Sequence, residues 1–207
     1  MPTPRRAETT ERREQVRGDV VLALQELLQE GVPYSDIGIE RLAQRTGISR
    51  TAFYFYFRDK REVLERLTSS VATELFVAAE TWLGASTGRD GLRAALCGLT
   101  DVFAKHAAIL RAVVEVTGYE REVARYWYGV IQRFIDATAA QIAAEQTAGR
   151  APGYDPAATA FALVWGVERT LFQQVARDTA FEHDDVVEAL TGIWLRAIYG
   201  GAEPVAR

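Results

Sequence analysis

The sequence is poor in the residues that build disulfides and metal sites. Its 207 residues include one cysteine, Cys97, and two histidines. A disulfide within the chain is excluded, and no cysteine and histidine residues have the spacing of a structural zinc site. Because Cys97 lies in an apolar run, we expect a buried small hydrophobe. We expect no cofactor and no metal.

Long apolar runs are also absent. No stretch of about twenty uncharged apolar residues occurs, and residues 1–13 are charged and polar where a signal peptide would be apolar. We therefore expect a soluble, cytoplasmic protein with no membrane partner. Hydrophobic residues make up 48% of the chain and charged residues 25%, so a substantial core can be buried.

Helical periodicity dominates what is present. Apolar residues recur at three- and four-residue intervals, and only the aromatic run 53–57 could pass for a strand. The pattern predicts an all-α fold of about nine helices. They are expected at 11–29, 39–45, 50–56, 59–83, 91–105, 106–116, 120–147, 156–177 and 184–199, with breaks at 84–88, 118, 149–156 and 178–183.

The segment Thr46 to Ser49 predicts the turn of a helix-turn-helix motif. Gly47 permits a left-handed backbone, Ile48 can pack into the core, and Ser49 can cap the next helix. Asp59 can likewise cap the fourth helix, and Glu62, three residues later, would complete a capping-box-like pair.

The short helix at 50–56 has two different sides. Helical spacing places Phe53 and Phe57 together, which favours a place in the core, as we also expect for Phe55. Tyr54 and Tyr56 fit either a structural or a DNA-contacting role.

Positive charge gathers around this helix although the whole chain carries −4. Residues 41–61 hold six basic residues against Asp59, a net +5, so the remainder carries −9. Such a patch fits contact with nucleic acid at one end of the protein, but a solvated charged face would look the same. The six basic residues are Arg41, Arg45, Arg50, Arg58, Lys60 and Arg61.

The segments IERLAQRT at 39–46 and GISRTAFYFYFRDKREVL at 47–64 resemble the DNA-binding signature of TetR-family regulators. ERTLF at 168–172 and IWLRAIYG at 193–200 are similar to the ethionamide-resistance (EthR) type within that family. The resemblance implies a helix-turn-helix domain at 1–58, followed at 59–207 by a connector helix and a helical body that dimerises and binds a ligand.

The resemblance also implies which residues contact DNA. Gly38 stands where relatives commonly have serine or threonine, so this chain lacks the hydroxyl that can contact a phosphate there. Lys60 lies in the first turn of a helix, where a phosphate is already favoured. With Arg41 of the basic stretch, the candidate contacts are Arg41, Ser49, Arg50, Thr51, Ala52, Tyr54, Tyr56 and Lys60.

Apolar stripes in the C-terminal helices could form plain core, but the resemblance implies a ligand chamber between them. Val164 and Val167 would leave this chamber few hydrogen-bond partners, which favours an elongated apolar or aromatic effector. The candidate lining residues are Leu92, Leu96, Leu99, Phe103, Trp127, Ile131, Phe134, Thr138, Phe161, Val164, Trp165, Val167, Phe172 and Trp194.

The helices at 156–177 and 184–199 are apolar on more than one side, which fits burial in a homodimer interface. Glu168 and Arg169 interrupt this apolar surface. We expect them to form an ion pair at the interface or to lie exposed at its rim.

These observations favour a ligand-responsive repressor that binds a palindromic double-stranded operator as a homodimer. A helical small-molecule-binding protein, or one that binds DNA without sequence preference, is the alternative. An enzyme is disfavoured, because the candidate residues near His106, His183 and Cys97 lack partners spaced for catalysis, and we expect no catalytic residues.

Overall fold

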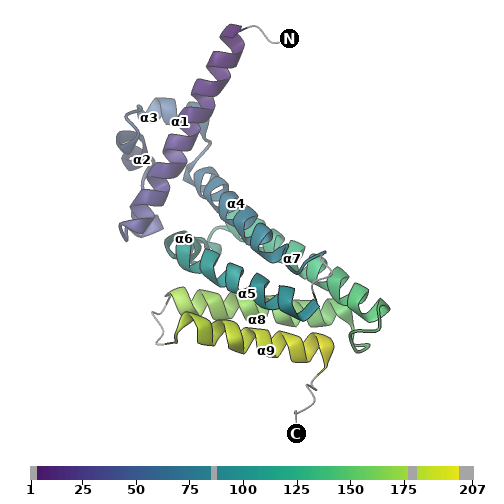
Figure 1. Cartoon of the computed structure of the whole chain (residues 1–207). Coiled ribbons are helices and arrows are strands. Elements are labelled where there is room, and N and C mark those ends of the chain that lie inside the picture. The colour runs from purple at the N-terminus through teal and green to yellow at the C-terminus, as the bar shows by residue number, and fades with distance from the viewer. Residues whose placement is uncertain (1–3, 85–87, 177–180, 201–207) are drawn as a thin grey trace. The chain divides into compact units, whose positions relative to one another are not determined.

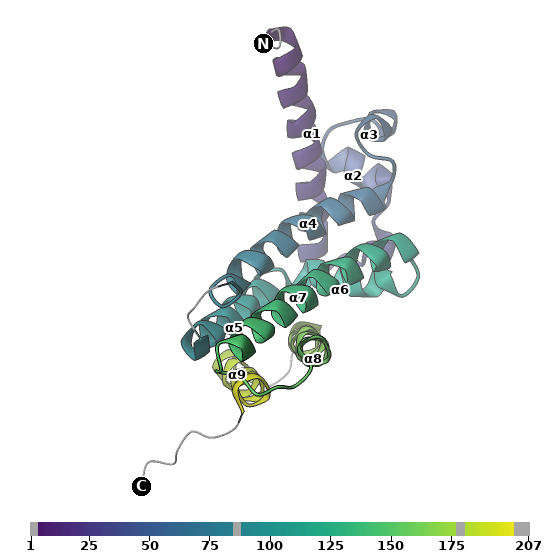
Figure 2. The same cartoon turned by 90° about the vertical axis from the view of Figure 1, so that its right-hand side faces the viewer.

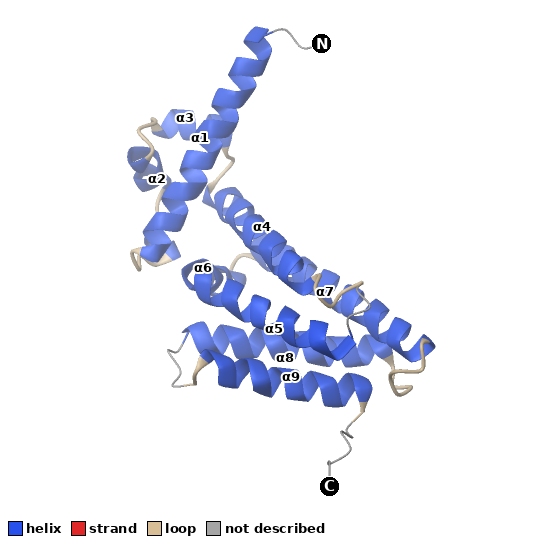
Figure 3. Cartoon of the chain, viewed as in Figure 1, coloured by secondary structure: helices blue, strands red, loops and turns tan. Residues whose placement is uncertain are grey.

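The structure is a computed structural model that describes residues 4–84, 88–176 and 181–200, and these residues form helices and connecting loops without a strand (Figure 3). The predicted all-α fold is confirmed. The elements are α1 (Pro4–Gln29), the 3-10 helix η1 (Tyr34–Asp36), α2 (Ile39–Arg45), α3 (Arg50–Tyr56), α4 (Lys60–Ala79), α5 (Gly88–Lys105), α6 (Ala107–Thr117), α7 (Arg121–Thr147), α8 (Pro156–Ala176) and α9 (His183–Tyr199).

Two helix ends differ from the sequence prediction by four residues or more. α1 begins at Pro4, earlier than predicted. α4 ends at Ala79 and not at Leu83, because the chain forms a tighter turn there, with the Trp82 N–H donating to the Ala79 carbonyl at 3.0 Å. The breaks predicted at 85–87 and 178–180 lie outside the described residues.

The chain divides into two compact units. The first contains residues 1–70 and 108–124, and the second contains residues 71–107 and 125–207. A domain boundary between residues 58 and 59 stays a prediction.

The first unit packs α1, α2 and α3 against one another (Figure 1). Leu24 and Leu27 of α1 are fully buried, as are Leu42 of α2 and Phe53 of α3. These side chains recur on one face of each helix, so burying them fixes how the three helices are turned.

The turn between α2 and α3 has the predicted construction. Gly47 has a φ of +69°, and the Ile48 N–H donates to the Ala43 carbonyl at 3.0 Å. The Ser49 Oγ accepts a hydrogen bond from the Ala52 N–H at 3.0 Å and so caps α3. Ile48 is half-buried and not fully in the core, so that detail of the prediction is wrong.

In the second unit, α8 and α9 lie side by side and α5 packs against both (Figures 1 and 2). A buried polar network fixes the turn after α4. The Gly84 N–H donates to the Gln141 Oε1 at 2.9 Å, and Gln141 in turn donates to Glu145, whose other partner is Arg150. Among the described residues, no helix combines the length and apolar character needed to cross a bilayer.

The two glycines that flank α2 predict opposite effects of one substitution. Gly38 is the N-cap of α2 with a φ of −87° and open space around it, so Gly38→Ser should add a cap and stabilise by a few tenths of a kcal/mol. Gly47 also has open space but a φ of +69°, so Gly47→Ser should destabilise by about 1 kcal/mol. Hydrogen exchange of α2 and α3 amides measures both, and equal signs would contradict the prediction.

Candidate DNA-binding surface and ligand chamber

α3 is oriented by two buried rings. Phe53 and Phe57 are 0% and 1% exposed, and their ring centroids lie 5.6 Å apart. The prediction that they belong to the core is confirmed. Phe55 is different, because it is 67% exposed with the Arg13 guanidinium 5.1 Å above its ring, so its predicted core position is wrong. It lies two residues from each buried ring, on another side of the helix.

Arg17 holds the C-terminal end of α3, a role that the sequence analysis missed. Its guanidinium donates to the Tyr56 carbonyl at 3.0 and 3.2 Å and lies 3.6 Å from Glu62. Helix C-termini leave carbonyls without helical partners, and a cation there is favourable. Arginine inside a predicted amphipathic helix gives no sequence signal of such a long-range bond.

The candidate DNA contacts lie mostly on the exposed side of the motif. Three of the eight candidates are half-buried, namely Ala52, Tyr56 and Lys60. Tyr54 is 49% exposed although aromatic, and the edge of its ring packs against Phe53 with centroids 5.8 Å apart. The exposed candidates are Arg41, Ser49, Arg50, Thr51 and Tyr54.

Ion pairs neutralise several arginines of the basic stretch, residues 41–61. Arg45 pairs with Glu30 and Glu26, Arg58 with Glu62, and Arg61 with Asp59 and Glu120. The two remaining arginines of the stretch, Arg41 and Arg50, are exposed and form no ion pair among the described side chains, although Arg41 helps to lower the pKa of Glu30. They are therefore the arginines most available to an incoming phosphate or base.

Lys60 already has three partners. Its ammonium donates to the carbonyls of Tyr34, Ile37 and Ser35 at 2.9, 3.1 and 3.4 Å and lies 4.3 Å from the centre of the Tyr34 ring. Partial burial lowers the pKa of Lys60. The lysine thus ties the start of α4 to η1. The predicted phosphate contact stays a prediction, and it would require the ammonium to release its longest bond, to Ser35.

The cap of α4 is only partly as predicted. Asp59 Oδ1 accepts from the backbone N–H groups of Arg61 and Glu62 at 2.8 and 3.1 Å, which confirms its capping role. Glu62 reaches back to the N–H of Arg58 at 2.9 Å and not to that of Asp59, so no true capping box forms.

A cavity lies within the second unit, between α4, α5, α7, α8 and α9. Most of the side chains that the sequence analysis assigned to a chamber line it. These are Leu92, Leu96, Leu99, Phe103, Trp127, Ile131, Phe134, Thr138, Val164, Val167 and Trp194.

Three predicted lining residues, Phe161, Trp165 and Phe172, are not among the residues around the cavity. Phe161 is 57% exposed, and its ring and that of Trp165 lie edge to face with centroids 6.5 Å apart. At 100° per residue these three positions share one side of α8, whereas Val164 and Val167 lie on another. The chamber is therefore lined by the aliphatic side of α8 and not by its aromatic side.

The sequence analysis missed other lining residues. Trp82 follows α4 and meets Trp194 edge to face with centroids 5.8 Å apart, while Phe76 stacks on Phe134 behind the lining at 3.9 Å. The apolar periodicity of α4 could have indicated Leu75 and Ala79. Trp82 was predicted to lie within this helix, but the helix ends at Ala79. The missed residues are Leu75, Ala79, Trp82, Leu83, Ala95, Val130 and Glu168.

Glu168 is the one charged residue in this lining. It forms the predicted ion pair with Arg169, whose Nε lies 4.0 Å from the Glu168 Oε2, but its predicted exposure at a rim is wrong. It is 4% exposed, and its Oε2 is buried without a hydrogen-bond partner. Burial raises the pKa of Glu168, against smaller opposing effects of Arg169 and the Trp127 indole. Glu168 lines the cavity one helical turn after Val164, at the border between the aliphatic and aromatic sides of α8.

The buried carboxyl predicts a pH dependence of stability. A folded-state pKa raised above the ordinary value of 4.5 makes the folded state bind the proton more tightly. The free energy of unfolding should therefore fall as pH rises from 4.5 through the folded pKa, by at most about 1.4 kcal/mol per pH unit. All four tryptophans lie in the second unit, so urea unfolding followed by tryptophan fluorescence reports on it.

Glu168→Gln should remove this part of the pH dependence. The exposed Glu80→Gln on the same unit is the matched control and should keep it. Parallel pH profiles for wild type and Glu168→Gln would contradict the assignment.

Two family models match the chain. The model of bacterial regulatory proteins of the tetR family matches residues 23–67, and that of the C-terminal domain of transcriptional regulator EthR matches residues 92–200. The first match covers α2 and α3 with the turn between them. The second covers most of the elements around the chamber.

Curated relatives and solved structures agree with these models. The HTH-type transcriptional regulator EthR of Mycobacterium tuberculosis (strain ATCC 25618 / H37Rv) is 37% identical over 187 residues, 87% of this chain and 86% of that protein. EthR of Mycolicibacterium smegmatis is 35% identical over 191 residues, covering 89% and 87%.

Among solved structures, the fold is similar to that of NalD, the secondary repressor of the MexAB-OprM multidrug efflux pump in Pseudomonas aeruginosa. The TM-score is 0.71 at 21% identity, over 91% of this chain and 98% of that one. A TetR transcription regulator from Haloarcula marismortui gives a TM-score of 0.72 at 15% identity, over 89% and 97%. The chain therefore belongs to the TetR family of bacterial transcriptional regulators and carries an EthR-type C-terminal domain.

Proposed function

We propose that this regulator is a cytoplasmic repressor that binds a palindromic operator as a homodimer and releases it when a small effector fills the chamber. The observation that carries the DNA-binding part is the pair of exposed, unpaired guanidinium groups, Arg41 on α2 and Arg50 at the start of α3. A helix that enters the major groove reads bases with side chains near its N-terminus.

The proposed roles follow from position on the motif. Arg50, Thr51 and Tyr54 stand on the exposed side of α3 and read base edges or the adjoining phosphates. Ser49, Ala52 and Tyr56 flank them. Arg41 and Lys60 contact backbone phosphates from α2 and from the first turn of α4, and such contacts set register without carrying sequence information.

The aromatic side of α8 supports dimerisation. Phe161 of α8 and Ile193 of α9 are 57% and 51% exposed in the single chain, and the two helices pack against each other. Large apolar side chains exposed on adjacent helices are stabilised when a second copy covers them. Two copies then present two α3 helices to successive major grooves, about 34 Å apart.

The chamber supports an elongated apolar or aromatic effector with one polar group. Its lining is aliphatic and aromatic except for Thr138 and Glu168. Three of the four tryptophans, Trp82, Trp127 and Trp194, contribute to it. The buried Oε2 of Glu168 has Arg169 at 4.0 Å but no hydrogen bond, so an effector that donates a hydrogen bond to it removes an unfavourable burial.

One continuous helix gives a route from effector to DNA. Leu75 and Ala79 of α4 line the chamber, and Lys60 at the other end of the same helix is bonded to η1 of the first unit. An effector that displaces the chamber end of α4 also moves the residues at its start, because a helix transmits displacement along its axis. This links effector binding to the separation of the two DNA-binding motifs.

The DNA contacts are tested on an operator selected from a random-sequence pool. Arg50→Ala and Thr51→Ala should weaken operator binding about ten- to hundredfold and relax sequence choice, because base contacts are lost. Lys60→Met should weaken operator and random DNA alike and flatten the salt dependence of log Kd by about one. Fluorescence anisotropy at several salt concentrations measures both effects.

Arg45→Gln is the matched control for Arg41→Gln. Both residues are exposed on α2, but Arg45 is already paired with Glu30 and Glu26. Only the Arg41 variant should lose affinity. Equal losses on specific and random DNA for every variant would favour the alternative, a DNA-binding protein without operator specificity.

The effector class is tested with two probes that differ in one hydroxyl group, 4-hexylphenol and hexylbenzene. The phenol should bind about tenfold more tightly, because its hydroxyl donates to a buried carboxylate. Quenching of the lining tryptophans measures binding, and release of operator DNA measures the response. In Glu168→Leu the preference for the phenol should disappear. Binding of both probes without any change in operator affinity would contradict the proposed coupling.

A further inference from the structure

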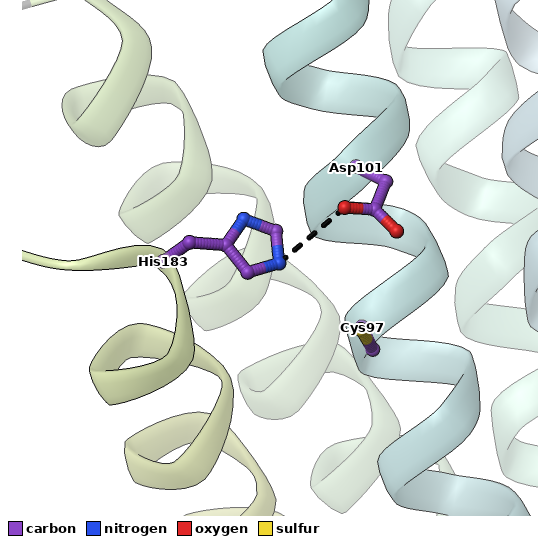
Figure 4. A group of neighbouring side chains, drawn as sticks. All are labelled: Cys97, Asp101 and His183. Atoms are coloured by element: carbon purple, nitrogen blue, oxygen red, sulfur yellow. Dashed lines mark ion pairs between the residues drawn. The ribbon is translucent and has the colours of Figure 1, made fainter.

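Three side chains of metal-binding type meet where α5 faces the start of α9 (Figure 4). Cys97 and Asp101 lie one turn apart on α5, and His183 is the first residue of α9. One ligand atom from each residue lies within 4.8 Å of the others, and the His183 Nε2 is 3.4 Å from the Asp101 Oδ1. Cys97 is half-buried, so its predicted full burial is wrong, and His183 has an ion-pair partner, Asp101, that its spacing in the sequence does not reveal.

We propose that this cluster binds one divalent zinc ion. Thiolate, imidazole and carboxylate are zinc ligands, with bond lengths of about 2.3, 2.0 and 2.1 Å. At tetrahedral angles these lengths place the ligand atoms roughly 3.3 to 3.6 Å apart. The pair from His183 and Asp101 already has that separation, and a side-chain rotation of Cys97 supplies the remainder.

The charges around the cluster suit a divalent cation. A Cys97 thiolate and an Asp101 carboxylate neutralise the two positive charges, with a neutral imidazole as third ligand and the thiol proton released to solvent. The basic residues of α5 one turn to either side of the cluster are Arg93 and Lys105. Each is paired with a carboxylate, Arg93 with Glu188 at 2.6 Å and Lys105 with Glu74 at 2.7 Å. Asp184 adds a further negative charge beside His183.

Access from solvent is open. Asp101 is exposed, and Cys97 and His183 are half-buried, so an ion can enter without unfolding the unit. Three protein ligands leave a fourth position for water, as in exchangeable zinc sites.

The ion would link α5 and α9, two helices that line the chamber, at a point outside the chamber. Leu96 and Phe103 line the cavity from the opposite side of α5, because they lie more than 90° around the helix from Cys97 and Asp101. α9 contributes Trp194 to the same lining. Zinc therefore stabilises the pairing of α5 with α9 and raises the unfolding temperature of the second unit without occupying the chamber.

Cobalt(II) substitution in the full-length, untagged chain tests the site. We expect one equivalent of Co²⁺ to give a thiolate-to-cobalt charge-transfer band with the visible bands of tetrahedral cobalt, and Zn²⁺ to displace it. Cys97→Ser should abolish the charge-transfer band. His183→Gln and Asp101→Asn should each weaken Co²⁺ binding about tenfold or more, through loss of one ligand. Zn²⁺ should raise the unfolding temperature of wild type but not of these variants.

His106→Gln is the matched control. His106 is the other histidine of the chain, buried beside Glu74 with its Nε2 3.0 Å from that carboxylate, and its replacement should leave the cobalt spectrum and affinity unchanged. A wild-type chain without a charge-transfer band at saturating Co²⁺, or a His183→Gln variant that binds as tightly as wild type, would overturn the proposal. The test uses neither DNA nor effector, so its outcome is independent of the proposed function.

Discussion

The burial of Phe53 and Phe57 determines what the protein can present to DNA. α3 has only seven residues, and isolated helices shorter than about 12 residues are marginal in water. Its existence and its rotation therefore depend on these two rings. With them fully buried, and with the Tyr56 carbonyl held by Arg17, the residues of α3 that stay exposed are Arg50, Thr51, Tyr54 and Phe55. The packing of Phe53 and Phe57 thus determines which side chains of α3 are available to contact DNA.

Signals that act within one turn of helix made most of the fold predictable. Gly47, Ser49 and Asp59 act on backbone groups no more than three residues away, and each does so as the sequence predicts. The end of α4 was missed because it depends on a distant residue, Gln141, which accepts the Gly84 N–H. Bonds of that kind have no periodicity to reveal them.

For the chamber as well, local sequence patterns predicted the helices, whereas the contacts between distant residues could not be predicted. α8 is apolar on two sides, and its sequence does not show which side faces the chamber. The sequence analysis therefore predicted that both the aromatic residues and the valines of α8 line it. The structure puts the aromatic side of α8 outside and brings Glu168 in. The meeting of Cys97 with His183 was equally invisible, because it depends on how α5 and α9 pack.

The distribution of charge explains how an acidic chain can still bind DNA selectively. Glu30, Glu62 and Glu120 neutralise arginines of the basic stretch. Attraction that does not depend on sequence scales with the number of phosphates neutralised, and charges beyond about 10 Å are screened in salt. Under the proposed function, the few unpaired cations therefore give modest affinity for random DNA. The proposed operator binding then depends on base contacts, which form only at a matching sequence and only while both motifs of a dimer reach their grooves.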